Sequence, residues 1–440
     1  MNRTFIPQLR RTPTAFKPSA QGFEERATLG EHTEDTPTLK GLNHRLLFRD
    51  ETLSGFGGAR VPTQSCPAAA GNPGLNGGTP LAFRSSVAIL LLALASLLIV
   101  PFATGAEAPS SAAAGAPIQQ KPDALLCGVL KAVCYSGFRQ GQHPDRGDGA
   151  LNPSDQEILE DLKILNRDGH FRLIRVYDSR ENSEAVLRLI KEHQLKMRVM
   201  LGAWLDAEVS NTNCSWLKQS FPQSVLDANK LKNAKEIERA IRLANLYSNI
   251  VVAVAVGNEA LVDWNDHMVP VEAVIRYARQ VKKSVSQPVT VADNYDWWAR
   301  HGSALAKELG FVSVHTYPIW EGKDIDQSMA FTINNLQAVR NALPHSRLVI
   351  TEAGWATVAQ EFGPRAGEEK QKRYYHDLYA WAGKMNITTF FFEAFDEDWK
   401  GAPNDPLGAE KHWGLFTVDR KAKLVMQDLY PDLAPTKAAK

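Results

Sequence analysis

The sequence predicts an α/β protein whose main domain is a (β/α)8 TIM barrel, preceded by a disordered N-terminal tail and one transmembrane segment. Over residues 125–440, eight short runs rich in β-branched and aromatic residues alternate with amphipathic helical patterns. Runs such as IVVAVAV at 250–256 are almost continuously apolar, which is typical of parallel strands buried on both faces. No glycine-rich phosphate loop follows the first run, which favours a closed barrel, with an open doubly wound sheet as the structural alternative.

The strands and helices can be placed from local signals. Asn152-Pro153 supplies a cap and a first-turn proline for a helix that Gly169 stops, Asn233 is expected to cap a helix with its apolar stripe from Ile237 to Ala244, and Pro270 opens a helix over 271–285. The expected strands are 126–135, 171–177, 197–203, 250–256, 289–292, 311–314, 348–351 and 388–392.

Composition excludes several classes of protein. With 44% hydrophobic and 22% charged residues, the chain is not disordered throughout. The 50 basic and 49 acidic residues leave a net charge of +1. The sequence has no stripe of basic residues that would indicate a nucleic-acid partner. The four cysteines form no CxxC pair, and the sequence has no HExxH, GxSxG or P-loop pattern. We therefore expect neither a metal nor an organic cofactor.

The N-terminal part divides around an apolar run. Residues 1–86 have few apolar runs and are interpreted as a disordered cytoplasmic tail. Residues 87–103 (VAILLLALASLLIVPFA) carry no charge and are just long enough to cross a hydrocarbon core of roughly 30 Å. We interpret them as a transmembrane anchor rather than a cleaved signal segment or a buried helix.

An Ala/Pro/Ser-rich tether follows over 104–124 and leads to the barrel domain, 125–440. The expected location is the cell membrane, single-pass, with the barrel domain periplasmic or extracellular. Secretion after signal cleavage is the alternative.

Two glutamates stand where a barrel enzyme keeps its chemistry. Residues that directly follow the strands of such a barrel converge on one face, and Glu259 and Glu352 end the fourth and seventh strands. A pair of carboxyl groups can cleave a glycosidic bond, because one protonates the leaving oxygen while the other attacks the sugar carbon or directs water to it. Asn258 is positioned to bind the neighbouring sugar hydroxyl, and Tyr317 to orient the strand-7 carboxylate.

Other rim residues have weaker signals. Trp355 and Trp413 offer flat faces for pyranose rings, although core packing is an equal alternative for each. Asp178 and Asp206 are more simply explained as helix caps, and His315 as a histidine satisfied at the end of its strand.

Several separate blocks resemble glycoside hydrolase family 17. They are IRVYD (174–178), VGNEAL (256–261), HTYP (315–318), VITEAGW (349–355), FFFEAFDEDWK (390–400) and EKHWGLF (410–416). The pattern is closer to the microbial branch than to the plant enzymes. The resemblance implies a TIM barrel, with Glu259 as general acid/base and Glu352 as nucleophile. It also implies substrate binding by these side chains: Asn258, Tyr177, Tyr317, Trp355, Phe395, Glu397, Lys400 and Trp413.

The resemblance further implies activity on β-1,3-glucan. We expect a retaining endo-1,3-β-glucanase that works through a covalent glycosyl-enzyme intermediate, with carboxyl groups about 5 to 5.5 Å apart. A β-1,3-glucanosyltransferase that remodels glucan is the first alternative, because transfer and hydrolysis share that intermediate. A glycosidase for another β-linkage and a non-catalytic carbohydrate-binding barrel are the others. The expected partners are a β-glucan substrate and, through residues 87–103, a membrane.

Overall fold

A computed structural model describes residues 116–145, 149–215, 217 and 219–436 of the chain. Within this part, eight parallel strands form a closed barrel in which each strand pairs with the next and β8 pairs with β1. The predicted eight-stranded barrel is thus confirmed. The strands are β1 (Lys131–Cys134), β2 (Leu173–Arg175), β3 (Arg198–Ala203), β4 (Val251–Asn258), β5 (Val289–Asn294), β6 (Val312–His315), β7 (Leu348–Gly354) and β8 (Thr389–Phe392).

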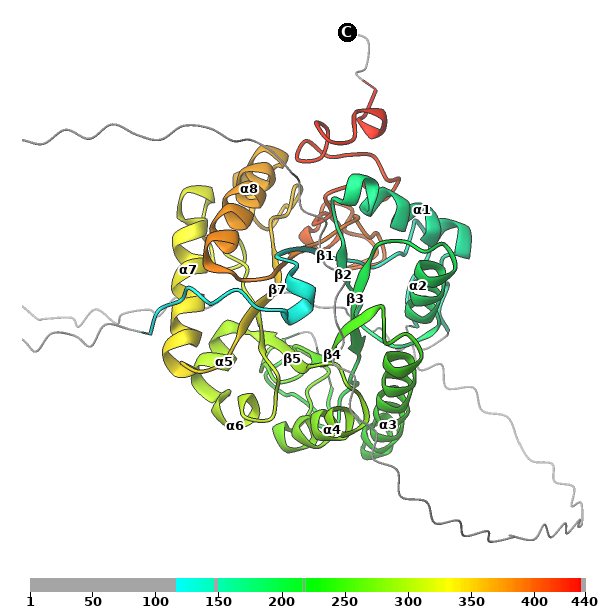
Figure 1. Cartoon of the computed structure of the whole chain (residues 1–440), viewed down its shortest axis with the longest axis vertical. Coiled ribbons are helices and arrows are strands. Elements are labelled where there is room, and N and C mark those ends of the chain that lie inside the picture. The colour runs from blue at the N-terminus through cyan, green and yellow to red at the C-terminus, as the bar shows by residue number, and fades with distance from the viewer. Residues whose placement is uncertain (1–115, 146–148, 216, 218, 437–440) are drawn as a thin grey trace, which may run out of the picture. The chain divides into compact units, whose positions relative to one another are not determined.

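Helices form an outer ring around the barrel (Figure 1). Their apolar stripes pack against the strands, so that almost every strand residue is buried, as the continuous apolar runs require. The helices are α1 (Asp155–Leu165), α2 (Glu181–Glu192), α3 (Gln223–Leu246), α4 (Val271–Ser284), α5 (Tyr295–His301), α6 (Ser303–Ala306), α7 (Ile325–Ala342) and α8 (Glu368–Met385).

Three local predictions need correction. The residue that caps α1 is Ser154, which forms a capping box with Glu157, rather than Asn152. Asn233 lies inside α3, where its buried side chain exchanges hydrogen bonds of 2.8 and 2.9 Å with the backbone of Asp206 instead of capping a helix. Strand β1 is shorter than expected, because Leu126 and Cys127 have positive φ angles and belong to the short 3-10 helix η1 (Leu125–Gly128).

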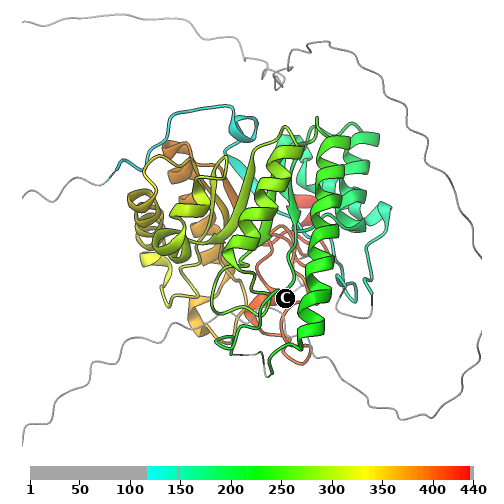
Figure 2. The ribbon, with the colours of Figure 1, turned by 90° about the horizontal axis from the view of Figure 1, so that it is seen from below.

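The segment before the barrel packs across its amino end. The buried Gln120 side chain accepts a hydrogen bond from the Leu348 N–H (2.7 Å) and donates one to the Leu348 carbonyl (2.9 Å), at the first residue of β7. Arg340 Nη2 donates to the same amide oxygen at 3.1 Å. Figure 2 shows this segment in cyan at one end of the barrel. The last residues of the predicted tether therefore belong to the folded domain.

The other N-terminal predictions lie outside the described residues. These are the tail at 1–86, the membrane segment at 87–103 and the tether up to residue 115. Among the helices that the structure describes, none is both long enough and apolar enough to cross a membrane.

Candidate active site

Glu259 follows β4 in a tight, strained turn. Gly257 and Glu259 have φ angles of +80° and +48°, a region that non-glycine residues seldom adopt. The turn is held from two sides, since the Glu259 N–H donates to the Ala292 carbonyl of β5 (2.8 Å) and the Asn265 side-chain amide donates to the Glu259 carbonyl. Such backbone strain persists only where surrounding contacts fix it, and it is frequent at functional sites.

Glu352 lies in β7 and is only 5% exposed. Its Oε1 accepts a hydrogen bond from Arg175 Nη1 and its Oε2 accepts one from the Tyr317 hydroxyl, both at 2.6 Å. Burial by itself raises the pKa of this carboxyl, but the nearby His315 and Arg175 charges and the two hydrogen bonds outweigh it and lower the pKa. The Glu352 side chain is therefore held ionised.

Arg175 is the last residue of β2 and lies at the mouth of the barrel, the carboxyl end of the strands where Glu259 and Glu352 are found. Its Nη1 binds Glu352 and its Nη2 donates to Asn258 Oδ1 at 2.5 Å, while its guanidinium lies 4.5 Å from the centre of the Tyr177 ring. Because Arg175 occupies the oxygen of the Asn258 amide, the amide N–H2 group of Asn258 remains to donate to a ligand.

Arg175 was not among the site residues predicted from the sequence, although its position at the end of an apolar strand could have indicated it. A charged residue that ends an apolar strand is costly to bury unless it is paired, and Arg175 is 1% exposed.

His315 lies between the two glutamates. Its Nδ1 is 2.9 Å from Glu259 Oε1 and 3.4 Å from Glu352 Oε2, and its Nε2 is 3.5 Å from Arg175 Nη1. One carboxylate oxygen of each glutamate and the histidine nitrogen all lie within 4.8 Å of one another. We expected His315 to be a histidine satisfied at the end of its strand, but it contacts both acids directly.

The same three residues have the spacing of a cation site, but their surroundings do not suit one. Arg175, which is always cationic, lies with Nη1 3.5 Å from His315 Nε2 and would repel a bound cation. The guanidinium also already supplies a positive charge to Glu352.

A fully buried acid supports the turn at Glu259 from behind. Asp293 Oδ2 accepts the Leu261 N–H at 3.0 Å and Oδ1 accepts the Asn294 N–H at 2.8 Å. Burial, with the negative charge of Glu259 second, raises the pKa of Asp293 well above its usual value. Asp293 therefore helps to hold the backbone of this turn in place.

Four of the predicted substrate-binding side chains are covered by protein, which corrects that assignment. Trp355, Phe395, Glu397 and Trp413 are at most 1% exposed. The Trp355 indole donates to the Arg365 carbonyl, and the Trp413 ring packs behind Tyr317 at 5.2 Å. The rings of Trp355 and Trp413 are therefore packed inside the protein and leave no face exposed for a sugar ring.

Lys400 is also nearly buried, and it neutralises two acids. Its Nζ lies 2.7 Å from Oε2 of both Glu393 and Glu397. Burial lowers the pKa of Lys400, but these two carboxylates outweigh burial and raise it, so the lysine stays charged. Of the predicted binding residues, Asn258, Tyr177 and Tyr317 remain half-exposed near the two glutamates.

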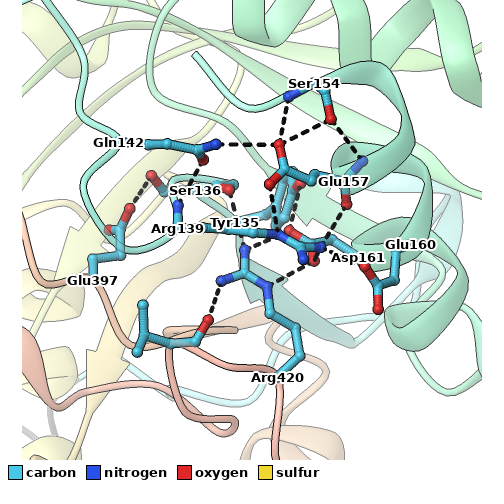
Figure 3. A network of polar contacts seen from close by, with 12 residues as sticks. Tyr135, Ser136, Arg139, Gln142, Ser154, Glu157, Glu160, Asp161, Glu397 and Arg420 are labelled. Carbon is cyan, nitrogen blue, oxygen red and sulfur yellow. Dashed lines mark hydrogen bonds and ion pairs between the residues drawn. The ribbon is translucent and has the colours of Figure 1, made fainter. Parts of the chain in front are cut away.

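A polar network ties the loop after β1 to the loop after β8 and to the C-terminal segment (Figure 3). The buried Asp161 binds Arg420 at 2.7 and 2.8 Å, Arg139 at 3.0 Å and the Tyr135 hydroxyl at 3.2 Å. Ser136 donates to Glu397. These contacts fix one rim of the mouth, although no sequence pattern singled them out.

Comparisons with known proteins agree with a glycosidase. Residues 132–414 match the BtgE/BtgC glycoside hydrolase domain. A glucan 1,3-beta-glucosidase of Arthroderma benhamiae is 25% identical over 278 residues, which cover 58% of this chain and 79% of that protein. A putative glucan endo-1,3-beta-glucosidase, btgC of Aspergillus niger, is 26% identical over 295 residues, 62% of this chain but only 40% of that protein. The chain thus spans well under half the length of that relative.

Solved structures show the same fold. An endo-laminarinase from Formosa Hel1_33_131 has 28% identity and a TM-score of 0.58, covering 69% of this chain and 87% of the other. A beta-1,3-glucanosyltransferase of Rhizomucor miehei, described as glycoside hydrolase family 17, has 22% identity and a TM-score of 0.51, covering 68% and 96%, and shows the fold alone. With the match over 132–414, this chain is a glycosidase and belongs to the BtgE/BtgC glycoside hydrolase domain family.

Proposed function

We propose that the chain is a retaining enzyme of glycoside hydrolase family 17 type that cleaves internal β-1,3 bonds of glucan. The observation that carries this proposal is the spacing of Glu259 and Glu352, which have carboxylate oxygens within 4.8 Å of each other. Retaining glycosidases keep their carboxyl groups about 5 to 5.5 Å apart, whereas inverting enzymes need about 6.5 to 9.5 Å to admit a water molecule. The activities for which the relatives and the laminarinase are named support β-1,3-glucan as the substrate.

In the first step, a Glu352 oxygen attacks the anomeric carbon of the sugar. The bond from that carbon to the leaving oxygen breaks, and Glu259 gives its proton to that oxygen. Arg175 and Tyr317 hold Glu352 ionised and oriented, so that little reorganisation is needed during attack.

In the second step, Glu259 removes the proton from water or from a sugar hydroxyl. The oxygen of that molecule forms a bond to the anomeric carbon, and the ester bond to Glu352 breaks. The Asn258 amide is left to donate to the sugar hydroxyl beside the reacting carbon, an interaction that strengthens in the transition state. Hydrolysis and glucanosyl transfer differ only in which acceptor arrives.

The test is to incubate the purified chain with laminari-oligosaccharides and to determine product lengths and anomeric configuration. We expect products with retained β configuration, whereas α products would contradict the mechanism. Glu352→Gln should lower turnover by at least about 10³-fold while the circular dichroism spectrum stays unchanged, because the nucleophile is lost. Turnover near that of the wild type would refute the nucleophile. Cleavage of cellulose or mannan oligosaccharides alone would assign another β-linkage, and binding without turnover would favour a carbohydrate-binding barrel.

A further inference from the structure

Hydrogen bonds fix the two peptide groups on either side of Glu259. These two groups set the φ and ψ angles of a residue, and with them the direction in which its side chain leaves the backbone. The N–H of the group between Asn258 and Glu259 donates to the Ala292 carbonyl at 2.8 Å. The carbonyl of the same group accepts a hydrogen bond from His267 Nε2 at 2.9 Å, and the carbonyl of the following group accepts one from the Asn265 side-chain amide. These contacts hold Glu259 in its left-handed conformation.

Two of the partners, Asn265 and His267, belong to one short segment, residues 265–267, which we call the clamp. The Asn265 side chain is only 1% exposed, and both of its polar ends are used. Its amide N–H2 group donates to the Glu259 carbonyl, and its Oδ1 accepts the His267 N–H at 3.0 Å. The Val269 N–H donates to the Ala260 carbonyl at 2.8 Å and closes the loop that contains the clamp. The two clamp side chains are therefore fixed relative to each other and to the turn.

The clamp is supported from the loop after β3. The Asn265 carbonyl accepts a hydrogen bond from the Asn211 side-chain amide at 2.7 Å. The Trp204 ring, directly after β3, lies against the His267 ring with centroids 4.5 Å apart and planes tilted by 32°. Because these contacts come from another strand connection, the clamp has a support that does not depend on Glu259.

Both ring nitrogens of His267 face hydrogen-bond acceptors. Nε2 faces the Asn258 carbonyl, and Nδ1 lies 3.2 Å from Asp266 Oδ1. A carbonyl and a carboxylate only accept, so each nitrogen has a proton and the ring is an imidazolium. Burial lowers the pKa of His267, but the hydrogen bond to Asp266 and the charge of that carboxylate, with smaller contributions from Asn258 and Glu259, outweigh burial and raise it. The Nε2–H group that holds the turn is therefore present at neutral pH.

The two glutamates have separate supports. The Glu259 carboxyl lies 2.9 Å from His315 Nδ1, and an oxygen of Glu259 lies within 4.8 Å of one of Glu352. Glu352 is held by Arg175 and Tyr317, whereas the backbone under Glu259 is held by the clamp. A general acid must come within about 2.6–3.2 Å of the atom that it protonates. A displacement of about 1 Å can slow such a reaction about 10²-fold.

We propose that Asn265 and His267 are positioning residues for the general acid/base, and that they hold the left-handed turn which directs the Glu259 carboxyl at the leaving oxygen. This inference rests on the proposed function, in which Glu259 gives a proton in the first step and removes one in the second. Loosening the clamp should slow the steps in which Glu259 transfers a proton and leave the attack by Glu352 unchanged.

The test compares two substrates of the full-length chain that differ in their need for an acid. The sugar alkoxide of laminaripentaose leaves only when it is protonated, whereas 2,4-dinitrophenolate leaves 2,4-dinitrophenyl β-laminaribioside without a proton. His267→Ala removes the donor to the Asn258 carbonyl. We expect kcat/KM on laminaripentaose to fall about 10- to 100-fold, because part of the contribution of the general acid is lost. On the dinitrophenyl substrate, kcat/KM reports the first step alone and should stay within about threefold of the wild type.

Two further variants test the hydrogen bonds themselves. His267→Gln places an amide N–H2 group near the position of Nε2 and should recover most of the activity that His267→Ala loses. Asn265→Asp keeps an acceptor for the His267 N–H but removes the donor to the Glu259 carbonyl, so it should show the same dependence on the leaving group as His267→Ala. Azide attacks the glycosyl-enzyme without giving up a proton, so it should raise kcat of His267→Ala on the dinitrophenyl substrate.

His170→Ala is the matched control. His170 is a half-buried histidine shortly before β2, at the amino end of the barrel, and its Nε2 lies 3.1 Å from the Tyr375 hydroxyl. This variant should lose stability without any dependence of its kinetics on the leaving group. Equal losses of His267→Ala on the two substrates, or unchanged kinetics on both, would overturn the proposal. If His267→Ala does not fold, as judged by its thermal unfolding, Asn265→Asp and His267→Gln decide by the same criterion.

The last measurement does not depend on turnover. In the chain labelled with nitrogen-15 histidine, the NMR signals of the His267 ring are identified by their loss in His267→Gln. Both ring nitrogens should be protonated at about pH 7. If the wild type converts neither substrate, the proposed function fails, but this spectrum still tests the clamp. An unprotonated Nε2 would overturn it.

Discussion

Replacing Arg175 with methionine tests how the buried guanidinium serves the nucleophile. Arg175→Met keeps much of the side-chain volume but removes the 2.6 Å hydrogen bond to Glu352 and the 2.5 Å hydrogen bond to Asn258. Without this charge, burial dominates, and the pKa of the Glu352 carboxyl should rise. The ionised nucleophile is then present only at higher pH.

The magnitudes follow from the burial of the pair. Breaking a buried ion pair by removing one partner costs about 3–5 kcal/mol of stability, because the other charge is left uncompensated. Hydrogen bonds to a charged group contribute about 1.5–3 kcal/mol, so loss of the bond to Glu352 should lower kcat/KM by about 10- to 100-fold. The acidic limb of the profile of kcat/KM against pH should also move to higher pH.

Arg420→Met is a matched control for this prediction. Arg420 is another buried arginine, but its ion pair is with the buried Asp161 at 2.7 Å rather than with Glu352. Urea unfolding should show a comparable loss of stability in both variants, while only Arg175→Met should shift the acidic limb. If the limb stays in place in Arg175→Met, or moves equally in Arg420→Met, the assignment of Arg175 to Glu352 is refuted.

Three further predictions concern single contacts. Tyr317→Phe removes the 2.6 Å hydrogen bond to Glu352 and should lower kcat by about tenfold with a smaller shift of the acidic limb than in Arg175→Met; unaltered kinetics would contradict the contact. Burial raises the pKa of Glu410 from 4.5 to about 7, so its neutral form stabilises the fold below pH 4.5 and this contribution is lost as the pH rises through about 7. Relative to Glu410→Gln, which cannot ionise, the unfolding free energy of the wild type should fall between pH 4 and 9 by at most about 3 kcal/mol, and a constant difference would argue against the raised pKa. Gln120→Ala leaves the buried N–H and C=O of Leu348 without their side-chain partner and should cost about 1–3 kcal/mol in urea unfolding, with kcat unchanged because the contact is at the opposite end of the barrel; a loss of activity at full stability would oppose this reading.

The alternation of apolar runs and amphipathic helices was sufficient to predict the eight strands and the barrel, because parallel strands buried on both faces have few other arrangements. The positions of Glu259 and Glu352 at the ends of strands four and seven followed from the same pattern. Local capping was less predictable, since Asn233 is engaged by the backbone of Asp206, a residue 27 positions away in the chain.

What only the tertiary structure decided is which side chains face the mouth and which are covered. Trp355 and Tyr317 both follow barrel strands, yet the first is fully buried and the second reaches Glu352, because the layer that packs behind each strand differs. The contacts of Arg175 with Glu352 and Asn258, and those of His315 with both glutamates, depend on four strands meeting at one point. Local sequence determines the direction of each strand, but the distance between two side chains on different strands is set by the closure and register of the whole barrel.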